Sequence, residues 1–236
     1  GHEALANRLT RYRNAENIGD LIDEEAQVYE EKRVKVRGLY AGVAEAITNS
    51  LHWTVLYQPE RRQFYIPSGR GGIHALADGR PDHWTIRGDS VFLDALALSL
   101  ESQKLAVDAL AAVLETQYPN GNIPCWRSRS SGSADRSQPP IGAFVALKLF
   151  ERLGDMESLR NAYPYLQRWH DFWTAPRTSG TPRRDGNNDG LLEWGSDTAL
   201  AGKGVPSWEM NASGRMRAGW ESGQADLPNW DAAPFN

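Results

Sequence analysis

The stretch WESGQADLPNWD, residues 220–231, gathers side chains that could act on a sugar. Within eleven positions it places three carboxylates, Glu221, Asp226 and Asp231, beside two tryptophans and a glycine. Glycoside hydrolysis uses one carboxylic acid to protonate the leaving oxygen and a second carboxylate to activate water or attack directly. A tryptophan-lined pocket would raise the pKa of such an acid by desolvation. The stretch therefore favours an acid–base site, and the simpler alternative is a solvated acidic loop.

Two other polar motifs have side chains that could hold a sugar. DRSQPP, residues 135–140, offers the donor fork of Arg136 and the amide of Gln138, although this motif could instead only cap a helix. Asp89, in GDSVFLDAL, stands at the start of an apolar helix and needs no role beyond capping it. The residue types also make Trp220, Glu221 and Trp230 candidates for contact with substrate.

The segment DGNNDGLLE, residues 185–193, has the spacing of a calcium loop. Alternate oxygen ligands come at its first, third and fifth positions, glycine stands at the sixth, and a backbone carbonyl follows at the seventh, as in the first half of an EF-hand. Ser196 stands where the loop usually ends in an acid, so a residue such as Glu193 would have to complete the shell. The alternative is an Asx-rich turn without a metal. The predicted ligands are Asp185, Asn187, Asp189, Leu191 and Glu193.

The composition disfavours some classes of function. The formal net charge is −4 and no run of Lys and Arg exceeds two residues, so we expect no nucleic-acid partner. No apolar run approaches the ~20 residues of a membrane span. The single cysteine, Cys125, excludes an intrachain disulfide, and both a cytoplasmic and a periplasmic location in a bacterium stay open. Nine tryptophans, mostly beside polar residues in the second half, favour a sugar partner because pyranose C–H faces pack on aromatic planes.

Helices are expected to position these motifs. Gly154 and Asp155 are predicted to be the C-cap of one helix and the N-cap of the next. Beyond Trp173 the helical periodicity of apolar residues is lost. Helical hairpins separated by the polar loop 120–138 predict an all-α toroid with functional loops at one end. We predict one or two helices over 22–47, extended chain over 50–69, a helix pair over 90–100 and 104–114, and a second pair over 140–152 and 156–173.

These segments together resemble glycoside hydrolase family 63 and, more loosely, the trehalases and glucoamylases. The resemblance runs from about Asn49 to Asp231 and implies a toroid of six helical hairpins, (α/α)6. We expect the chain to be a single domain over 1–236 that holds only the N-terminal part of this toroid. The implied activity is hydrolysis, with inversion, of α-linked glucosides, glucosylglycerates, mannosylglycerates or related sugars. The resemblance is carried by NSLHW, GDSVFLDAL, DRSQPPIGA, DGNNDGLLEWG and WESGQADLPNWD.

The resemblance also implies roles for single residues. Asp89 and Gln138 would hold hydroxyls of the cleaved sugar, and Gly223 would let the backbone approach it. Gly88 stands where the family commonly has a tryptophan. The family's general acid is the aspartate two residues after Glu-Ser-Gly, and this position is Ala225 here. The general base would come from a glutamate beyond this chain.

Ala225 leaves several explanations open. The simplest is an Asp→Ala exchange made to trap substrate, followed by a naturally inactive relative that binds sugar, and then by a shifted acid at Asp226. A related toroid enzyme, such as a polysaccharide lyase or an uronyl hydrolase, is a third class of function, which only Arg136 supports. We expect an oligosaccharide or glycoside as partner and calcium as cofactor, without an organic cofactor. The sugar, its linkage and the oligomeric state are not specified by the sequence.

Overall fold

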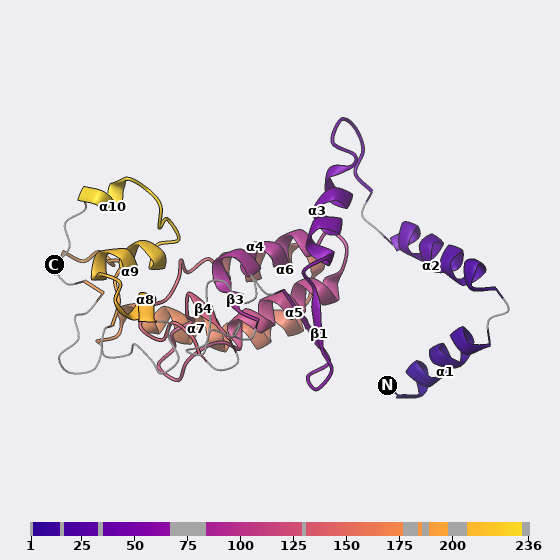
Figure 1. Cartoon of the computed structure of the whole chain (residues 1–236), viewed down its shortest axis with the longest axis horizontal. Helices are drawn as coiled ribbons and strands as arrows, with labels where there is room; N and C mark the ends of the chain where they lie inside the picture. Colours follow the sequence, from indigo (N-terminus) through magenta and orange to yellow (C-terminus); the bar gives the residue numbers. More distant parts are fainter. Residues whose placement is uncertain are drawn as a thin grey trace. The chain divides into compact units, whose positions relative to one another are not determined.

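The computed structural model describes residues 2–14, 17–32, 35–66, 84–128, 131–176, 184–185, 189–197 and 207–232 (Figure 1). Residue contacts divide the chain into two compact units, Gly1–Glu45 and Ala46–Asn236. The first unit contains α1 (His2–Arg13) and α2 (Ile18–Lys32), where Arg11 pairs with Glu24. Helix α3 (Val43–His52) crosses the boundary between the units. The predicted helical segment 22–47 thus contains the end of α2 and the start of α3, while residues 35–42 between them are not helical.

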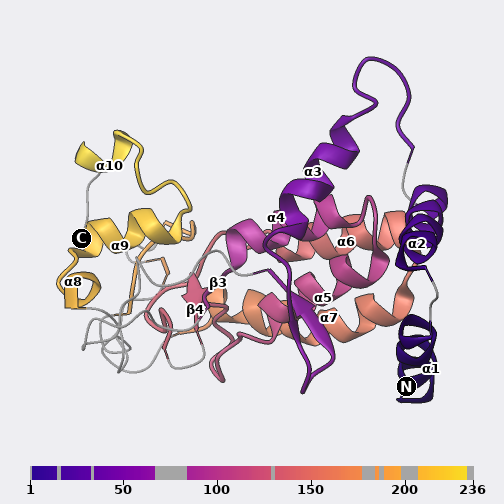
Figure 2. The ribbon, with the colours of Figure 1, turned by 45° about the vertical axis from the view of Figure 1, so that its right-hand side comes forward.

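Four helices form the core of the second unit (Figure 2). They are α4 (Gly88–Leu98), α5 (Gln103–Leu114), α6 (Gly142–Leu153) and α7 (Met156–Thr174). Helix α4 contacts α5 and α6, and α5 also contacts α6 and α7. The two predicted helix pairs are therefore confirmed, each end lying within two residues of its predicted position.

Apolar periodicity explains which sides of these helices are buried. In α4 the buried residues Val91, Phe92, Ala95 and Leu98 recur at helical spacing, so one face of the helix is apolar. Phe92 stacks on Trp169 of α7, with ring centroids 5.7 Å apart. Both rings are almost completely buried, and each large aromatic side chain removed from water stabilises the fold by about 1.5–3 kcal/mol.

Helix ends are fixed by the predicted caps. Gly154 ends α6 in the left-handed conformation, with φ of 67°, which glycine adopts without steric cost. Asp155 begins α7 because its carboxylate accepts hydrogen bonds from the N–H groups of Glu157 and Ser158. The same carboxylate accepts a hydrogen bond from Gln103 Nε2 of α5, at 3.1 Å, so this cap also joins the two hairpins.

Short strands complete the unit. β1 (Leu56–Gln58) pairs with β2 (Gln63–Tyr65) in an antiparallel hairpin within the predicted extended segment. β3 (Ile86–Arg87) pairs with β4 (Trp126–Arg127), which lies inside the polar loop 120–138 and was not predicted. This second pairing holds the polar loop against the N-terminus of α4.

The segment after α7 contains helices that the sequence analysis did not predict. These are α8 (Ser207–Met210), α9 (Gly214–Glu221) and α10 (Asn229–Ala232). The prediction that helical structure ends at Trp173 is therefore wrong. Ser213 caps α9, and its buried face includes charged residues, Arg217 and Glu221, so the apolar periodicity that usually marks a helix is missing.

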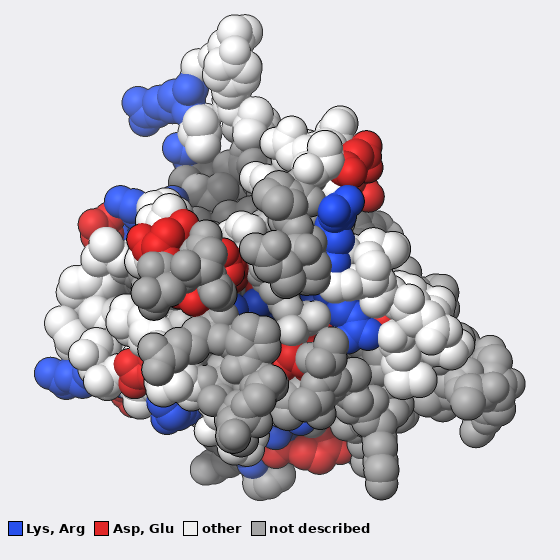
Figure 3. Space-filling model, turned by 90° about the vertical axis from the view of Figure 1, so that its left-hand side faces the viewer, with Lys and Arg blue, Asp and Glu red and all other residues white. Residues whose placement is uncertain are grey.

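The protein is mostly helical, as predicted, but the described residues do not trace a closed toroid. Within the same residues, no helix is both long and apolar enough to cross a bilayer. On the face drawn in Figure 3, acidic and basic side chains are interspersed over the described surface.

Candidate functional site

Two of the predicted motifs meet where Gln138 packs on Gly88. A Cβ atom at Gly88 would overlap the side-chain amide of Gln138, so any larger residue here would displace this amide. The Gln138 side chain is 1% exposed, and neither of its amide atoms has a hydrogen-bond partner among the described residues. A buried amide without a partner is costly, which is typical of a group that pairs with a ligand.

Asp89 lies in the first turn of α4 and follows Gly88 in the sequence. Its carboxylate accepts a hydrogen bond from Ser90 N at 2.9 Å and lies 3.5 Å from Arg87 Nη2, while its side chain stays 29% exposed. The N-cap of α4 is Arg87, so the reading of Asp89 as the cap residue is wrong. The sequence analysis also missed Asp94, whose pKa is raised by burial and by the negative charge of Asp89.

Glu221 is a buried carboxylate held by four donors. It is completely buried and pairs with Arg184 through two contacts of 2.5 and 2.6 Å. It also accepts hydrogen bonds from the backbone N–H groups of Ser137 and Gly195, both at 2.7 Å. This arrangement fixes the motif that starts at residue 220 to the loop that carries Gln138. Contact between Glu221 and substrate stays a prediction.

Arg136 belongs to a buried ionic network. Burial opposes its charge, but Asp135 and Glu209 raise the pKa of Arg136, so the guanidinium stays protonated. Arg217 of α9 joins the network at 3.2 Å from Asp135. Since Arg136 is only 3% exposed, its forked donors are directed at protein carboxylates. Sequence reasoning missed Glu209 and Arg217, which lie in the segment where no helix was predicted.

Trp220 packs on the same network. The Arg136 guanidinium lies over its ring, 5.0 Å from the centroid, and Trp208 meets it edge-on with centroids 5.9 Å apart. The carbonyl of Trp220 lies 3.9 Å from the Cys125 thiol. Burial raises the pKa of Cys125 to about 11, which leaves the thiol protonated and poorly nucleophilic at neutral pH.

The turn after α9 contains the position of the expected general acid. Gly223 has φ of 71°, and an added Cβ would lie 3.0 Å from Pro139 Cγ, so this glycine allows the turn to approach the 135–140 loop. Ala225 and Asp226 are both exposed. Trp230 closes the turn by donating its indole N–H to the carbonyl of Gln224 at 3.0 Å.

The structure therefore brings three sequence motifs into one region: the start of α4, the 135–140 loop and the 220–231 stretch. The family model described as the mannosylglycerate hydrolase MGH1-like glycoside hydrolase domain matches residues 82–234. The chain belongs to this family. No curated protein matches the chain. All three motifs lie within the MGH1-like domain, which indicates a glycosidase with a carbohydrate substrate.

The MGH1-like domain also contains the predicted calcium loop. The Asp185 carboxylate accepts hydrogen bonds from the N–H groups of Asp189, at 2.9 Å, and Gly190, at 3.1 Å. Leu191 and Glu193 follow on the same segment, whereas Asn187 lies outside the described residues. Among the residues that are described, no three His, Cys, Asp or Glu side chains gather as metal ligands. Calcium therefore stays a prediction.

Proposed function

We propose that this MGH1-like domain binds an α-linked glucoside, or a related sugar, in the site of an inverting glycosidase whose general-acid position is occupied by Ala225. The observation that carries the proposal is the Gln138 amide, buried against Gly88 without a hydrogen-bond partner among the described residues. A sugar hydroxyl can accept from and donate to an amide at the same time, so it would satisfy both polar atoms.

The neighbouring residues would share the work of binding. The partly exposed carboxylate of Asp89 can accept a hydrogen bond from a second hydroxyl of the same ring. Trp220 offers an indole held in place by Arg136 and Trp208, which suits packing against sugar C–H groups. Glu221 would act indirectly, because it holds the backbone of Ser137 and so fixes the loop that carries Gln138.

Hydrolysis requires two further groups. An acid must donate a proton to the glycosidic oxygen, and a base must activate water on the opposite face, with the two carboxyl groups about 6.5–9.5 Å apart in an inverting enzyme. The methyl group of Ala225 carries no proton to donate. Loss of a positioned general acid lowers the rate by about 10²- to 10⁴-fold while leaving most ground-state contacts in place. The chain would therefore bind substrate and turn it over slowly.

The decisive experiment is Ala225→Asp in the full-length gene product, assayed on α-glucosides, glucosylglycerate and mannosylglycerate. We expect hydrolysis to increase by about 10²- to 10⁴-fold, with the inverted anomer as the first product seen by NMR. Asp226→Ala in the same background is the control and should retain the recovered activity. If Asp226 proves indispensable and position 225 has no effect, the acid is Asp226. If Ala225→Asp stays inactive but the sugars still bind, the protein is a non-catalytic carbohydrate-binding relative.

We also propose calcium as a structural cofactor of the loop formed by residues 185–193. Asp185 and Asp189, with the carbonyl of Leu191, supply oxygen atoms of the type that Ca²⁺ prefers, and Asn187 and Glu193 would complete the shell. The loop leads directly to Gly195, whose N–H group holds Glu221. A bound ion would thus stabilise the arrangement of the sugar site without taking part in the reaction.

A further inference from the structure

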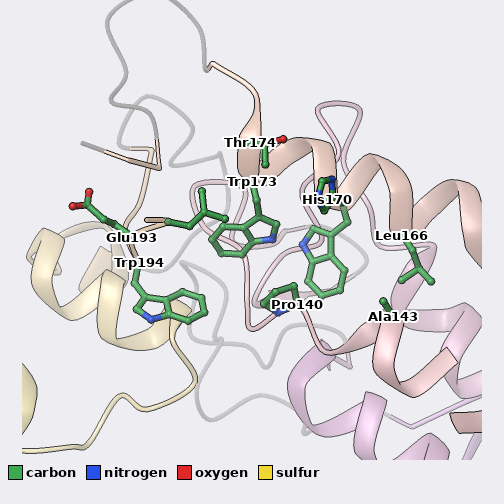
Figure 4. Close-up of a pocket in the computed structure, with 10 residues that line it drawn as sticks. Pro140, Ala143, Leu166, His170, Trp173, Thr174, Glu193 and Trp194 are labelled. Carbon is green, nitrogen blue, oxygen red and sulfur yellow. The ribbon is translucent and has the colours of Figure 1, made fainter. Parts of the chain in front are cut away.

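A cavity of about 350 Å³ lies between the start of α6, the second half of α7 and residues 192–194 (Figure 4). Its walls are mostly apolar and include Pro140, Leu166 and three tryptophans. Cavities that bind small molecules have volumes of about 300–1,000 Å³, aromatic walls and a few polar groups that orient the ligand. The cavity therefore has the size and lining of a ligand site, and nothing in the proposed function uses it.

One polar group of the cavity wall lacks a partner. Trp173 is 6% exposed, and its indole N–H forms no hydrogen bond with any described residue. Trp169, in the same wall, instead donates its indole N–H to Ser137 Oγ at 2.8 Å. A buried N–H group is rarely left unpaired, because losing its hydrogen bond to water costs free energy. The Trp173 N–H is thus suited to a ligand that offers an acceptor.

The aromatic walls are held in fixed positions. Trp194 meets Trp173 edge-on, with centroids 5.6 Å apart and planes at 87°. The Arg184 guanidinium lies 5.4 Å from the Trp173 ring centroid, while Glu221 holds Arg184 in turn. Figure 4 shows the side chains of Trp173, Trp194 and Pro140 near one another in this part of the wall. Because these rings are already held in place, little side-chain freedom is lost when a ligand binds. A flat ring is the shape that packs well against such aromatic side chains.

We propose that this cavity binds a planar apolar ring that carries an oxygen acceptor, with the ring packed among the tryptophans and the oxygen hydrogen-bonded to Trp173 Nε1. Two sources share this chemistry: a free phenol-like molecule, and the aryl aglycone of a glycoside. Only the assignment to an aglycone depends on the proposed sugar site.

The test follows the indole N–H signals of the ¹⁵N-labelled full chain by NMR, and Trp173→Phe identifies the signal of Trp173. We expect phenol to shift this signal in a saturable way and to leave that of Trp53, which is 90% exposed, unchanged. Trp194→Ala should weaken phenol binding by about three- to tenfold, since an aromatic contact contributes about 0.5–1.5 kcal/mol. Ala143→Leu, which fills the cavity from an exposed position on α6, should weaken it as well, whereas Trp53→Ala should have no effect.

Three ligands separate the two sources. Methyl α-glucoside tests the sugar site alone, phenol tests the cavity alone, and phenyl α-glucoside tests both. Tighter binding of phenyl α-glucoside, weakened by both Trp194→Ala and Gln138→Ala, assigns the cavity to an aglycone. Equal affinities for phenol and phenyl α-glucoside assign the cavity to free aromatic molecules. This assignment holds even if methyl α-glucoside does not bind and the proposed sugar site is wrong. The proposal is overturned if phenol leaves the Trp173 signal unchanged, or if Trp194→Ala and Ala143→Leu bind phenol as tightly as the parent.

Discussion

Glu221 belongs to the motif that indicated acid–base chemistry, yet its contacts are those of a structural anchor. Two contacts to Arg184 and two backbone N–H groups use both of its oxygens, and none of its surface is exposed. A carboxylate with this many donors is held firmly in one position. Its position next to Ser222 and Gly223 would therefore keep the following turn in place.

We expect Glu221→Gln to lower the free energy of unfolding by about 3–5 kcal/mol, because it leaves the buried Arg184 charge without its counter-ion. Urea unfolding followed by circular dichroism measures this change. Asp226→Asn, at an exposed position in the same stretch, is the matched control and should change stability by less than about 0.5 kcal/mol. A loss below about 1 kcal/mol for Glu221→Gln would contradict the anchoring role.

Gln138 should show opposite effects on stability and on binding. In the free protein its buried amide has no partner among the described residues, so Gln138→Leu should raise the free energy of unfolding, by about 1 kcal/mol. In the complex the same change removes hydrogen bonds to the sugar and should weaken binding by about 1–3 kcal/mol, as measured by calorimetry. Asp89→Ala should weaken binding by a similar amount. Unchanged affinity in both variants would remove these residues from the sugar site.

Among the helices, α7 depends on a cap that also reaches α5. Asp155 accepts hydrogen bonds from the side chain and backbone of Ser158, and from Gln103 and the backbone of Glu157, and these bonds lower the pKa of Asp155. A lowered folded-state pKa means that the unfolded chain binds the proton more readily. The cap's contribution is therefore complete above the ordinary pKa of 3.8 and is lost as the pH falls through the lowered value.

We predict that Asp155→Ala lowers the free energy of unfolding at neutral pH by about 0.5–2 kcal/mol, the usual effect of losing an N-cap. Asp155→Asn keeps a side-chain oxygen for the cap but removes the titrating group. Its stability should therefore fall less steeply than that of the parent below pH 3.8. Urea midpoints measured between about pH 2.5 and 7, a range that includes that pKa, test both statements. Identical pH profiles for the parent and Asp155→Asn would show that the cap does not contribute as described.

The helical hairpins were predictable because apolar spacing and caps act over short distances. Gly154 and Asp155 mark their helix ends through local conformation and local hydrogen bonds, which the sequence displays directly. The contact of Gln138 with Gly88 was not predictable, since it joins residues far apart in the sequence. Helix α9 was missed for a related reason: its buried charges, Arg217 and Glu221, are neutralised by distant partners, so they read as surface residues.

For the whole molecule, calcium binding should appear as an increase in thermal stability. A ligand that binds only the folded state stabilises it by about 2.7 kcal/mol at a hundred times its dissociation constant. We expect excess chelator to lower the melting temperature and excess calcium to restore it, with a smaller response in Asp189→Asn because one carboxylate ligand is removed. A melting temperature that is the same in chelator and in calcium would exclude a structural ion at this loop.

The contact between Gly88 and Gln138 also limits how this protein can change over evolutionary time. A tryptophan at position 88, which the resemblance to family 63 leads us to expect, would need the space that the Gln138 amide fills. The two positions are therefore coupled: a substitution at 88 requires the side chain at 138 to become smaller or to turn away. Relatives should therefore carry either the glycine with the inward amide or a tryptophan with a different side-chain arrangement at position 138.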